Sequence, residues 1–412
     1  MVRHESFFDS LAVLDPHSTE WQSGLAGLGA LRLVDAAIEH GHLARSDWSA
    51  RRTVRDAVEA VSEGNPIRGI LSRLLDEVEK PVPEWKTVAA SLVSYGRALD
   101  FDGRWVLATN VFEIASEVAT ANGAWSVAVE ANIALGGSAR RAGNWKKSHA
   151  GYAEALYLAG GLGDVASSLT VRVGMANTQL ARGNLVEADR LLTSVVTEAD
   201  AESLHEVAAD ALHSLSSVQH NRGNLADAVT TAYEALGKAS NPTRKDTILA
   251  DIAAYFAELG MHDAARDAHL IVSVTSRYQW VRWQAMLNLM ELAAQDGAEQ
   301  DFDRYASELA TAELDPRLRA YYLFYRGIGC LGFGREREGR ESLEEAERFA
   351  SVKGIHQVSF EAEKALSRTT ELTRAPSAVA ATHSDRVRPD TQDIANSLSH
   401  LREMALSSTQ HV

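Results

Sequence analysis

The chain has 412 residues, enough for two or three ordinary domains or for one long array of repeats. Hydrophobic residues make up 45% of the sequence and charged residues 24%, so the chain can bury a core and is not disordered throughout. The 41 Lys and Arg residues against 56 Asp and Glu residues give a formal net charge of −15, which repels nucleic acid and anionic lipid at long range. The composition therefore argues against a dedicated nucleic-acid-binding protein.

The sequence also restricts the cellular compartment and the redox chemistry. Cys330 is the single cysteine, so an intramolecular disulfide and a cysteine-rich zinc site are excluded, and we expect it to pack as a small hydrophobic side chain. No segment approaches the ~18–20 apolar residues of a membrane-spanning helix, and the N-terminus lacks an apolar signal-peptide region. We therefore expect a soluble cytoplasmic protein with no membrane partner.

Residues 1–80 contain helical segments such as GALRLVDAAIEHG and PIRGILSRLLDEVEK. They do not match the repeat that follows, which leaves two interpretations. They form a helical cap over the apolar face of the first repeat, as repeat arrays need, or a small helical domain with its own function. Residues 48–75 hold two helical segments with basic residues, but their turn and small-residue spacing match no helix-turn-helix pattern.

Residues 81–372 repeat a glycine turn between segments whose apolar residues recur at helical spacing. A small residue stands seven positions before and five positions after most of these glycines, and an apolar residue stands twelve after each. Two antiparallel helices approach closely only where small side chains meet, and glycine adopts the left-handed turn without a Cβ penalty. The pattern predicts an all-α fold of stacked helical hairpins. The turn glycines, spaced 40, 40, 40, 37, 37 and 37 residues apart, are Gly103, Gly143, Gly183, Gly223, Gly260, Gly297 and Gly334.

The units resemble the tetratricopeptide repeat (TPR), and LSSVQHNRGNLADAVTTAYEALGKASNP at 215–242 is the nearest copy. The intervals between the turn glycines exceed the 34 residues of the usual TPR unit. Longer helices, as in the TPR domains of bacterial peptide- or signal-sensing regulators, would account for the difference. The resemblance implies a right-handed α-solenoid of about seven units. The unit around Gly297 matches least well, because Met290 and Phe302 occupy its small positions, so its packing must differ.

In the TPR family, the first helix of each hairpin lines a concave groove that holds partner peptides. Polar side chains at helical spacing suit the backbone amides of an extended peptide, although plain solvent exposure is the alternative for each residue. Several aromatic residues late in the array are expected to form an exposed apolar patch in the groove. The alternative is that a helix over 355–371 packs on these residues and makes them part of the core. The candidate groove residues are Arg140, Asn177, His213, Ser217, His220, Asp251, Asn288, Glu291, Tyr321, Phe324 and Tyr325.

The C-terminal part differs from the array. Residues 373–389 are rich in Ala, Ser and Pro and are predicted to form a flexible linker. Residues 390–406 are predicted to form an amphipathic helix, with Ile394, Leu398, Leu401 and Ala405 on one stripe. We expect this helix to dock on an apolar groove, either of its own chain, which masks the groove, or of a second copy.

The sequence leads us to expect no catalytic residue, no metal site and no cofactor. GIGCLGFG at 327–334 contains Gly-x-Gly-x-x-Gly, but a helix precedes it where a dinucleotide site needs a strand. His213 and His220, like His262 and His269, are seven residues apart, with no third metal ligand nearby. We therefore expect a non-catalytic scaffold or regulatory subunit that binds a protein or peptide. The alternative is a signal-responsive transcription regulator whose N-terminal helices contact DNA, which a basic face on residues 51–80 would favour.

Overall fold

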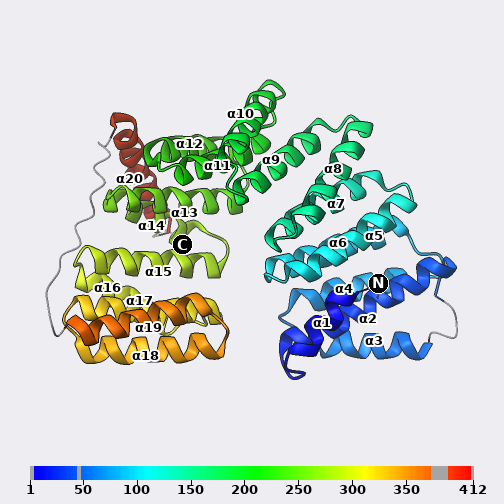
Figure 1. Ribbon diagram of the computed structural model, residues 1–412, viewed down its shortest axis with the longest axis horizontal. Helices are drawn as coiled ribbons and strands as arrows, with labels where there is room; N and C mark the ends of the chain where they lie inside the picture. Colours follow the sequence, from blue (N-terminus) through cyan, green and yellow to red (C-terminus); the bar gives the residue numbers. More distant parts are fainter. Residues whose placement is uncertain (1–3, 44–47, 373–387, 410–412) are drawn as a thin grey trace. The chain divides into compact units, whose positions relative to one another are not determined.

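The computed structural model describes residues 4–43, 48–372 and 388–409, and over these ranges the regular secondary structure is entirely α-helical (Figure 1), as predicted. The helices in the described residues are α1 (Glu5–Val13), α2 (Thr19–His40), α3 (Trp48–Ala60), α4 (Pro66–Val78), α5 (Trp85–Phe101), α6 (Trp105–Ala121), α7 (Trp125–Arg141), α8 (Trp145–Leu162), α9 (Val165–Ala181), α10 (Leu185–Ala201), α11 (His205–Asn221), α12 (Leu225–Lys238), α13 (Pro242–Glu258), α14 (His262–Thr275), α15 (Gln279–Gln295), α16 (Glu299–Ala310), α17 (Pro316–Gly332), α18 (Glu336–Val352), α19 (His356–Leu372) and α20 (Pro389–Thr409).

The chain folds as two compact units, residues 1–207 and 208–412, which we call unit 1 and unit 2. In unit 1, the N-terminal helices share one hydrophobic core with the first repeats, because Leu31 of α2 and Leu71 of α4 belong to the same buried cluster as Phe112 of α6. Helix α4 packs directly on α5. The cap interpretation of residues 1–80 stays a prediction, and this shared core is the observation that supports it.

Consecutive helices pair as hairpins: α5 with α6, α7 with α8, α9 with α10, α11 with α12, α13 with α14, α15 with α16, and α17 with α18. All seven predicted turn glycines are left-handed, with φ between +71° (Gly297) and +80° (Gly223), which confirms the predicted turns. In each turn, the N–H that follows the glycine donates to a carbonyl five residues back, as from Asn184 to Gln179 at 2.9 Å. This bond satisfies one of the carbonyls that a helix end leaves open.

The predicted small positions lie where the paired helices touch. Ala188 and Ala228, five residues after their turn glycines, are fully buried, as predicted. At the position seven residues before the turn, a Cβ on Gly96 would lie 2.5 Å from the ring of Phe112. The small residues therefore leave the space that a large side chain of the paired helix fills.

The hairpin with large residues at these positions packs differently, as expected. Phe302 of α16 is buried, and a Cβ on Gly329 of α17 would meet its ring at 2.2 Å. The ring thus fits because the next hairpin supplies a glycine opposite it. The Gly-x-Gly-x-x-Gly motif lies inside α17, so Gly329 serves helix packing there.

The glycine pattern of the sequence did not predict the turns between hairpins. Gly123, Gly163 and Gly354 also adopt a left-handed φ, in the turns that connect one hairpin to the next. Ser203 occupies the same kind of turn with φ +58°. From Gly103 to Gly223 a turn therefore recurs every 20 residues, and tryptophans that open α6, α7 and α8 mark this shorter period in the sequence.

Candidate functional site

We call the side of the array formed by the first helix of each hairpin the first-helix face. All eleven candidate groove residues lie on first helices, from α7 to α17. Arg140 and Asn177 belong to unit 1 and the other nine to unit 2. Their role in binding stays a prediction. Their contacts show which of these side chains hydrogen-bond or form an ion pair with another helix and which make only local contacts.

In unit 1, the two candidate residues are half-buried. Arg140 hydrogen-bonds with Tyr152 of the paired helix α8, and burial raises the pKa of that tyrosine hydroxyl. Neighbouring first helices are joined by ion pairs, such as Arg97 to Glu130 at 2.7 Å between α5 and α7. Arg140 therefore contributes to packing within its own hairpin.

In unit 2, histidines on α11 pair with carboxylates on α13. The distance from His213 Nε2 to Asp251 Oδ2 is 2.6 Å, and from His220 Nε2 to Glu258 Oε1 it is 2.8 Å. The His220 ring also stacks on Tyr255, with 4.9 Å between the ring centroids. Each pair joins residues 38 positions apart, so these two side chains engage the adjacent repeat.

Two further candidate residues differ in their contacts. Ser217 donates to the carbonyl of His213 at 3.3 Å, within α11, and it also hydrogen-bonds with the hydroxyl of Tyr255 of α13. Asn288 accepts a hydrogen bond from Gln284 at 3.3 Å, within α15. Ser217 therefore engages the adjacent repeat, as the two histidines do, whereas the contact of Asn288 is local.

A second group on the first-helix face, which we call the aromatic–carboxylate cluster, consists of Glu291 of α15, Tyr321, Phe324 and Tyr325 of α17, and Glu361 of α19. Tyr325 donates a hydrogen bond to the Glu291 carboxylate. Burial raises the pKa of Glu291, and the nearby charge of Glu361 raises it further. Burial and the Glu291 charge together raise the pKa of the Tyr325 hydroxyl, so it stays protonated at neutral pH and can donate.

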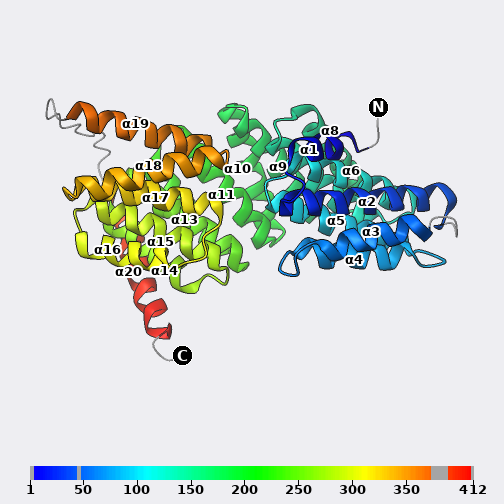
Figure 2. The ribbon, with the colours of Figure 1, turned by 90° about the horizontal axis from the view of Figure 1, so that it is seen from below.

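The aromatic side chains of the cluster are partly covered. Helix α19 lies along α18 and α17 (Figure 2), and the Tyr321 hydroxyl donates to Gln357 of α19 at 3.4 Å. Tyr321, Phe324 and Tyr325 pack at the edge of the local core and remain half-buried. The structure therefore lies between the two predicted alternatives, because α19 covers the rings without burying them fully.

The C-terminal helix α20 packs on α14 and α12, the second helices of two hairpins of unit 2 (Figure 1). Ile394, Leu398 and Ala405 of the predicted stripe are buried, whereas Leu401 is exposed. Arg402 pairs with the buried Asp267 of α14 at 2.6 Å, and Arg388 pairs with Asp227 of α12. Helix α20 begins at Pro389, and residues 373–387 of the predicted linker lie outside the described residues.

The residue eleven positions after each turn glycine shows why α20 docks on α14. This residue is polar in five hairpins: Glu154, Ser194, Glu234, Glu308 and Glu345. It is a buried isoleucine in the other two, Ile114 of α6 and Ile271 of α14. Both belong to second helices that an additional helix covers, since α1 packs on α6 and α20 packs on α14, although α20 also touches α12, where the equivalent Glu234 is exposed. An apolar residue at this position is the signal that the sequence analysis overlooked.

Two arginines of α3 and α4 are paired with carboxylates of the same segment. Arg55 binds Asp76 at 2.8 Å and both carboxylate oxygens of Glu79. Arg68 lies 3.6 Å from Glu63. Residues 48–80 hold six Lys and Arg residues and six Asp and Glu residues, so the segment has no net charge to attract DNA.

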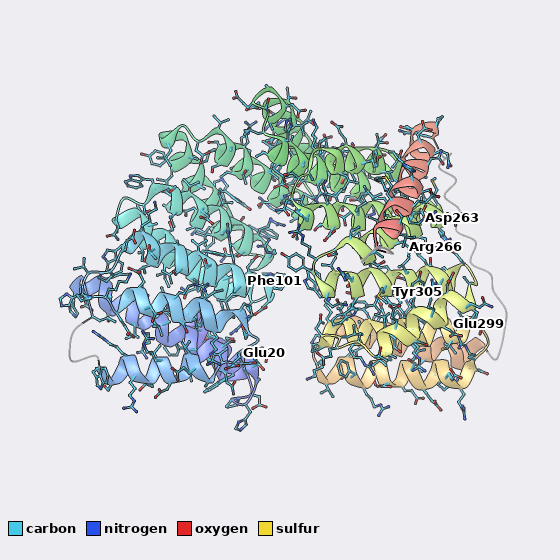
Figure 3. All side chains as sticks on the ribbon, turned by 180° about the vertical axis from the view of Figure 1, so that it is seen from behind. Glu20, Phe101, Asp263, Arg266, Glu299 and Tyr305 are labelled. Carbon is cyan, nitrogen blue, oxygen red and sulfur yellow. The ribbon has the colours of Figure 1, made fainter. Side chains whose placement is uncertain are left out.

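Among the described residues, no three His, Cys, Asp or Glu side chains are placed to hold a metal ion. His262 pairs with Asp296, which also accepts from Arg266 (Figure 3) at 2.6 Å. Cys330 is buried, as expected, and burial raises the pKa of its thiol. In the same part of the chain, none of the helices combines the length and apolar character needed to cross a bilayer.

The fold is therefore an all-α, TPR-like solenoid of stacked helical hairpins, with polar and aromatic side chains along its first helices. No protein family and no curated protein matches the sequence. Among solved structures, the chain is similar to BtubC (BKLC) from P. vanneervenii, with a TM-score of 0.36, 14% identity, and coverage of 73% of this chain and 95% of that one.

Two further solved structures are similar at the same distant level. A Rap protein complexed with Competence and Sporulation Factor has a TM-score of 0.35 and 11% identity, with coverage of 85% of this chain and 98% of that one. The TPR domain of P58(IPK) has a TM-score of 0.21 and 12% identity, with coverage of 78% and 99%. The assignment to a TPR-like fold rests on the hairpins themselves.

Proposed function

We propose that this chain is a non-catalytic scaffold or regulatory subunit that binds a protein or peptide segment along the first-helix face of unit 2. The observation that carries the proposal is the aromatic–carboxylate cluster, where three half-buried rings from one helix lie beside two carboxylates from neighbouring helices. The proposal includes a role like that of the bacterial peptide- or signal-sensing regulators that the sequence resembles.

The physical support comes from the kinds of side chains that the face offers. Tyrosine and phenylalanine provide large contact areas, and a tyrosine hydroxyl adds a polar end that can meet a backbone amide. Asn288 of α15 and Ser217 of α11 add short polar groups along the same face. A face of this composition suits an extended segment that carries both apolar and polar side chains.

The test is the selection of peptides from a phage-displayed library of random dodecapeptides on the immobilised full chain. The footprint of a selected peptide is then mapped by hydrogen exchange. We expect slower exchange in α15 and α17 when the peptide is bound, and no change in α16 or α18. Failure to select any peptide, or a footprint confined to second helices, would refute the proposal.

The proposal assigns α20 a separate role. Because α20 docks on the second helices α12 and α14, any masking by this helix acts on that surface and not on the first-helix face. The two ion pairs of Arg388 and Arg402 favour this docked position. We propose self-masking within one chain, and exchange of α20 between two copies would instead appear as a dimer in light scattering.

A further inference from the structure

We propose that the aromatic–carboxylate cluster recognises a basic side chain, arginine or lysine, of the bound segment. This inference rests on the proposed function and specifies its partner. It is carried by three observations on the same face: two carboxylates without a cation, three aromatic rings beside them, and a nearby site where the chain satisfies a similar arrangement with its own side chain.

Carboxylates of α11 and α13 on the first-helix face have basic side chains as partners, whereas those of the cluster have none within the described ranges. Asp210 pairs with Arg244 at 2.6 Å, and Asp251 and Glu258 each contact a histidine. Among the described residues, Glu291 and Glu361 have no Lys, Arg or His partner. Their hydrogen bonds come from uncharged groups: Gln295 and Tyr325 to Glu291, and Gln357 to Glu361.

A cation from a partner would reduce the repulsion between the Glu291 and Glu361 carboxylates. Glu291 is half-buried and senses the like charge of Glu361, and both effects raise its pKa above the usual range. A guanidinium or ammonium group between the two carboxylates would compensate both charges at once. A charge-assisted hydrogen bond to a carboxylate is about twice as strong as a neutral one.

The rings provide the second contact for the same cation. Tyr321 stacks on Tyr325 with 5.9 Å between centroids, and Phe324 lies 5.5 Å from Tyr325. A cation over a ring face is attracted within about 6 Å of the centroid. Arg317 already lies 6.0 Å from the Tyr321 ring, which shows that a guanidinium can reach one of these rings. Among the described residues, Arg317 forms no ion pair with Glu291 or Glu361.

The chain contains its own example of this recognition. On α13, Tyr255 and Glu258 hold His220 of α11, with the imidazole stacked on the tyrosine ring and a nitrogen 2.8 Å from the carboxylate. The cluster offers the same two groups, a tyrosine ring and a carboxylate, but among the described residues no basic side chain of the chain contacts its carboxylates. We assign that missing group to the partner.

The experiment uses the same dodecapeptide library on three full-length proteins: the wild type, the double variant Glu291→Gln/Glu361→Gln, and the control Glu308→Gln. Glu308 lies on the second helix α16 and is exposed, so the control also removes a carboxylate near the cluster in sequence but on another face. We expect peptides selected on the wild type and on the control to be enriched in Arg and Lys. On the double variant, that enrichment should fall to the composition of the library.

One selected peptide is then measured in solution. Replacing its basic residue by Gln should weaken binding to the wild type by about 3- to 30-fold, the range expected for a cation–π contact with a partly exposed ion pair. The same replacement should change binding to the double variant little. The thermal midpoints of all three proteins are compared first, so that a loss of folding is recognised.

The outcomes separate the two proposals. Selection of peptides that bind the first-helix face without enrichment in Arg or Lys, or equal enrichment on the double variant, overturns the inference and leaves the proposed function standing. Selection of no peptide overturns both.

Discussion

Ser203 adopts φ +58° in the turn between α10 and α11, at a position where equivalent turns have glycine. A left-handed conformation costs an L-residue about 1–2 kcal/mol, whereas glycine loses roughly 0.5–1 kcal/mol more chain entropy on folding. We therefore expect Ser203→Gly to stabilise the protein by about 0.5–1 kcal/mol in chemical denaturation. The matched reverse change, Gly183→Ser, should destabilise it, because Gly183 has φ +79°. A lower stability of Ser203→Gly would contradict the turn assignment.

His269 of α14 is a buried side chain whose Nδ1 atom has no hydrogen-bond partner among the residues that the structure describes. Burial lowers the pKa of its imidazole from 6.5 to about 4. As pH falls from 6.5 to 4, the unfolded chain takes up a proton that the folded chain does not, so stability decreases by up to about 1.4 kcal/mol per pH unit. Above pH 6.5 the imidazole is neutral in both states and contributes no pH dependence.

The variant His269→Gln tests this expectation. Its free energy of unfolding should fall less steeply between pH 6.5 and pH 4 than that of the wild type, when both are measured by urea denaturation at several pH values. The slopes above pH 7 should agree and serve as the internal control. Equal slopes in the acid range would mean that His269 becomes protonated in the folded protein.

Among the second helices, α14 provides both an ion pair and a buried apolar side chain at its contact with α20. Asp267 pairs with Arg402 of α20, and Ile271, four residues further along α14, lies on the same stripe and is buried. The equivalent residue of α12, Glu234, is exposed. We expect Ile271→Glu to release α20, because a buried carboxylate without a partner is strongly unfavourable.

Hydrogen exchange of the amides of residues 390–406 measures this release. Their protection should fall by about tenfold or more in Ile271→Glu, the equivalent of 1.4 kcal/mol or more. Glu345→Gln, at the equivalent position of α18, is the matched control and should leave their exchange unchanged. Unchanged protection in Ile271→Glu would show that α20 does not depend on this stripe.

At the scale of the whole molecule, the division into two units cuts the segment that the sequence presents as one array. The division falls between residues 207 and 208, inside α11 and close to the turn in which serine replaces glycine. The glycines of the hairpin turns do not mark the unit boundary, because each hairpin turn is closed by residues within a few positions of it. The contacts between helices decide which helices belong to the same compact unit, and the turn residues do not specify these contacts.

The sequence by itself determined the hairpins, since a positive φ and a close helix contact each require a particular residue type at one position: Gly223 in a turn, Ala228 at a contact. Only the tertiary structure decided which groove residues have partners. His213 and Asp251 are 38 residues apart and meet because α11 and α13 are neighbours, whereas Glu291 has no Lys, Arg or His partner within the described part of the chain. Likewise, the stripe of α20 indicated that the helix docks, but its position depends on Asp227, Asp267 and Ile271 on helices far away in sequence. Local patterns specify backbone conformation, and side-chain partners are specified only when distant segments are brought together by packing.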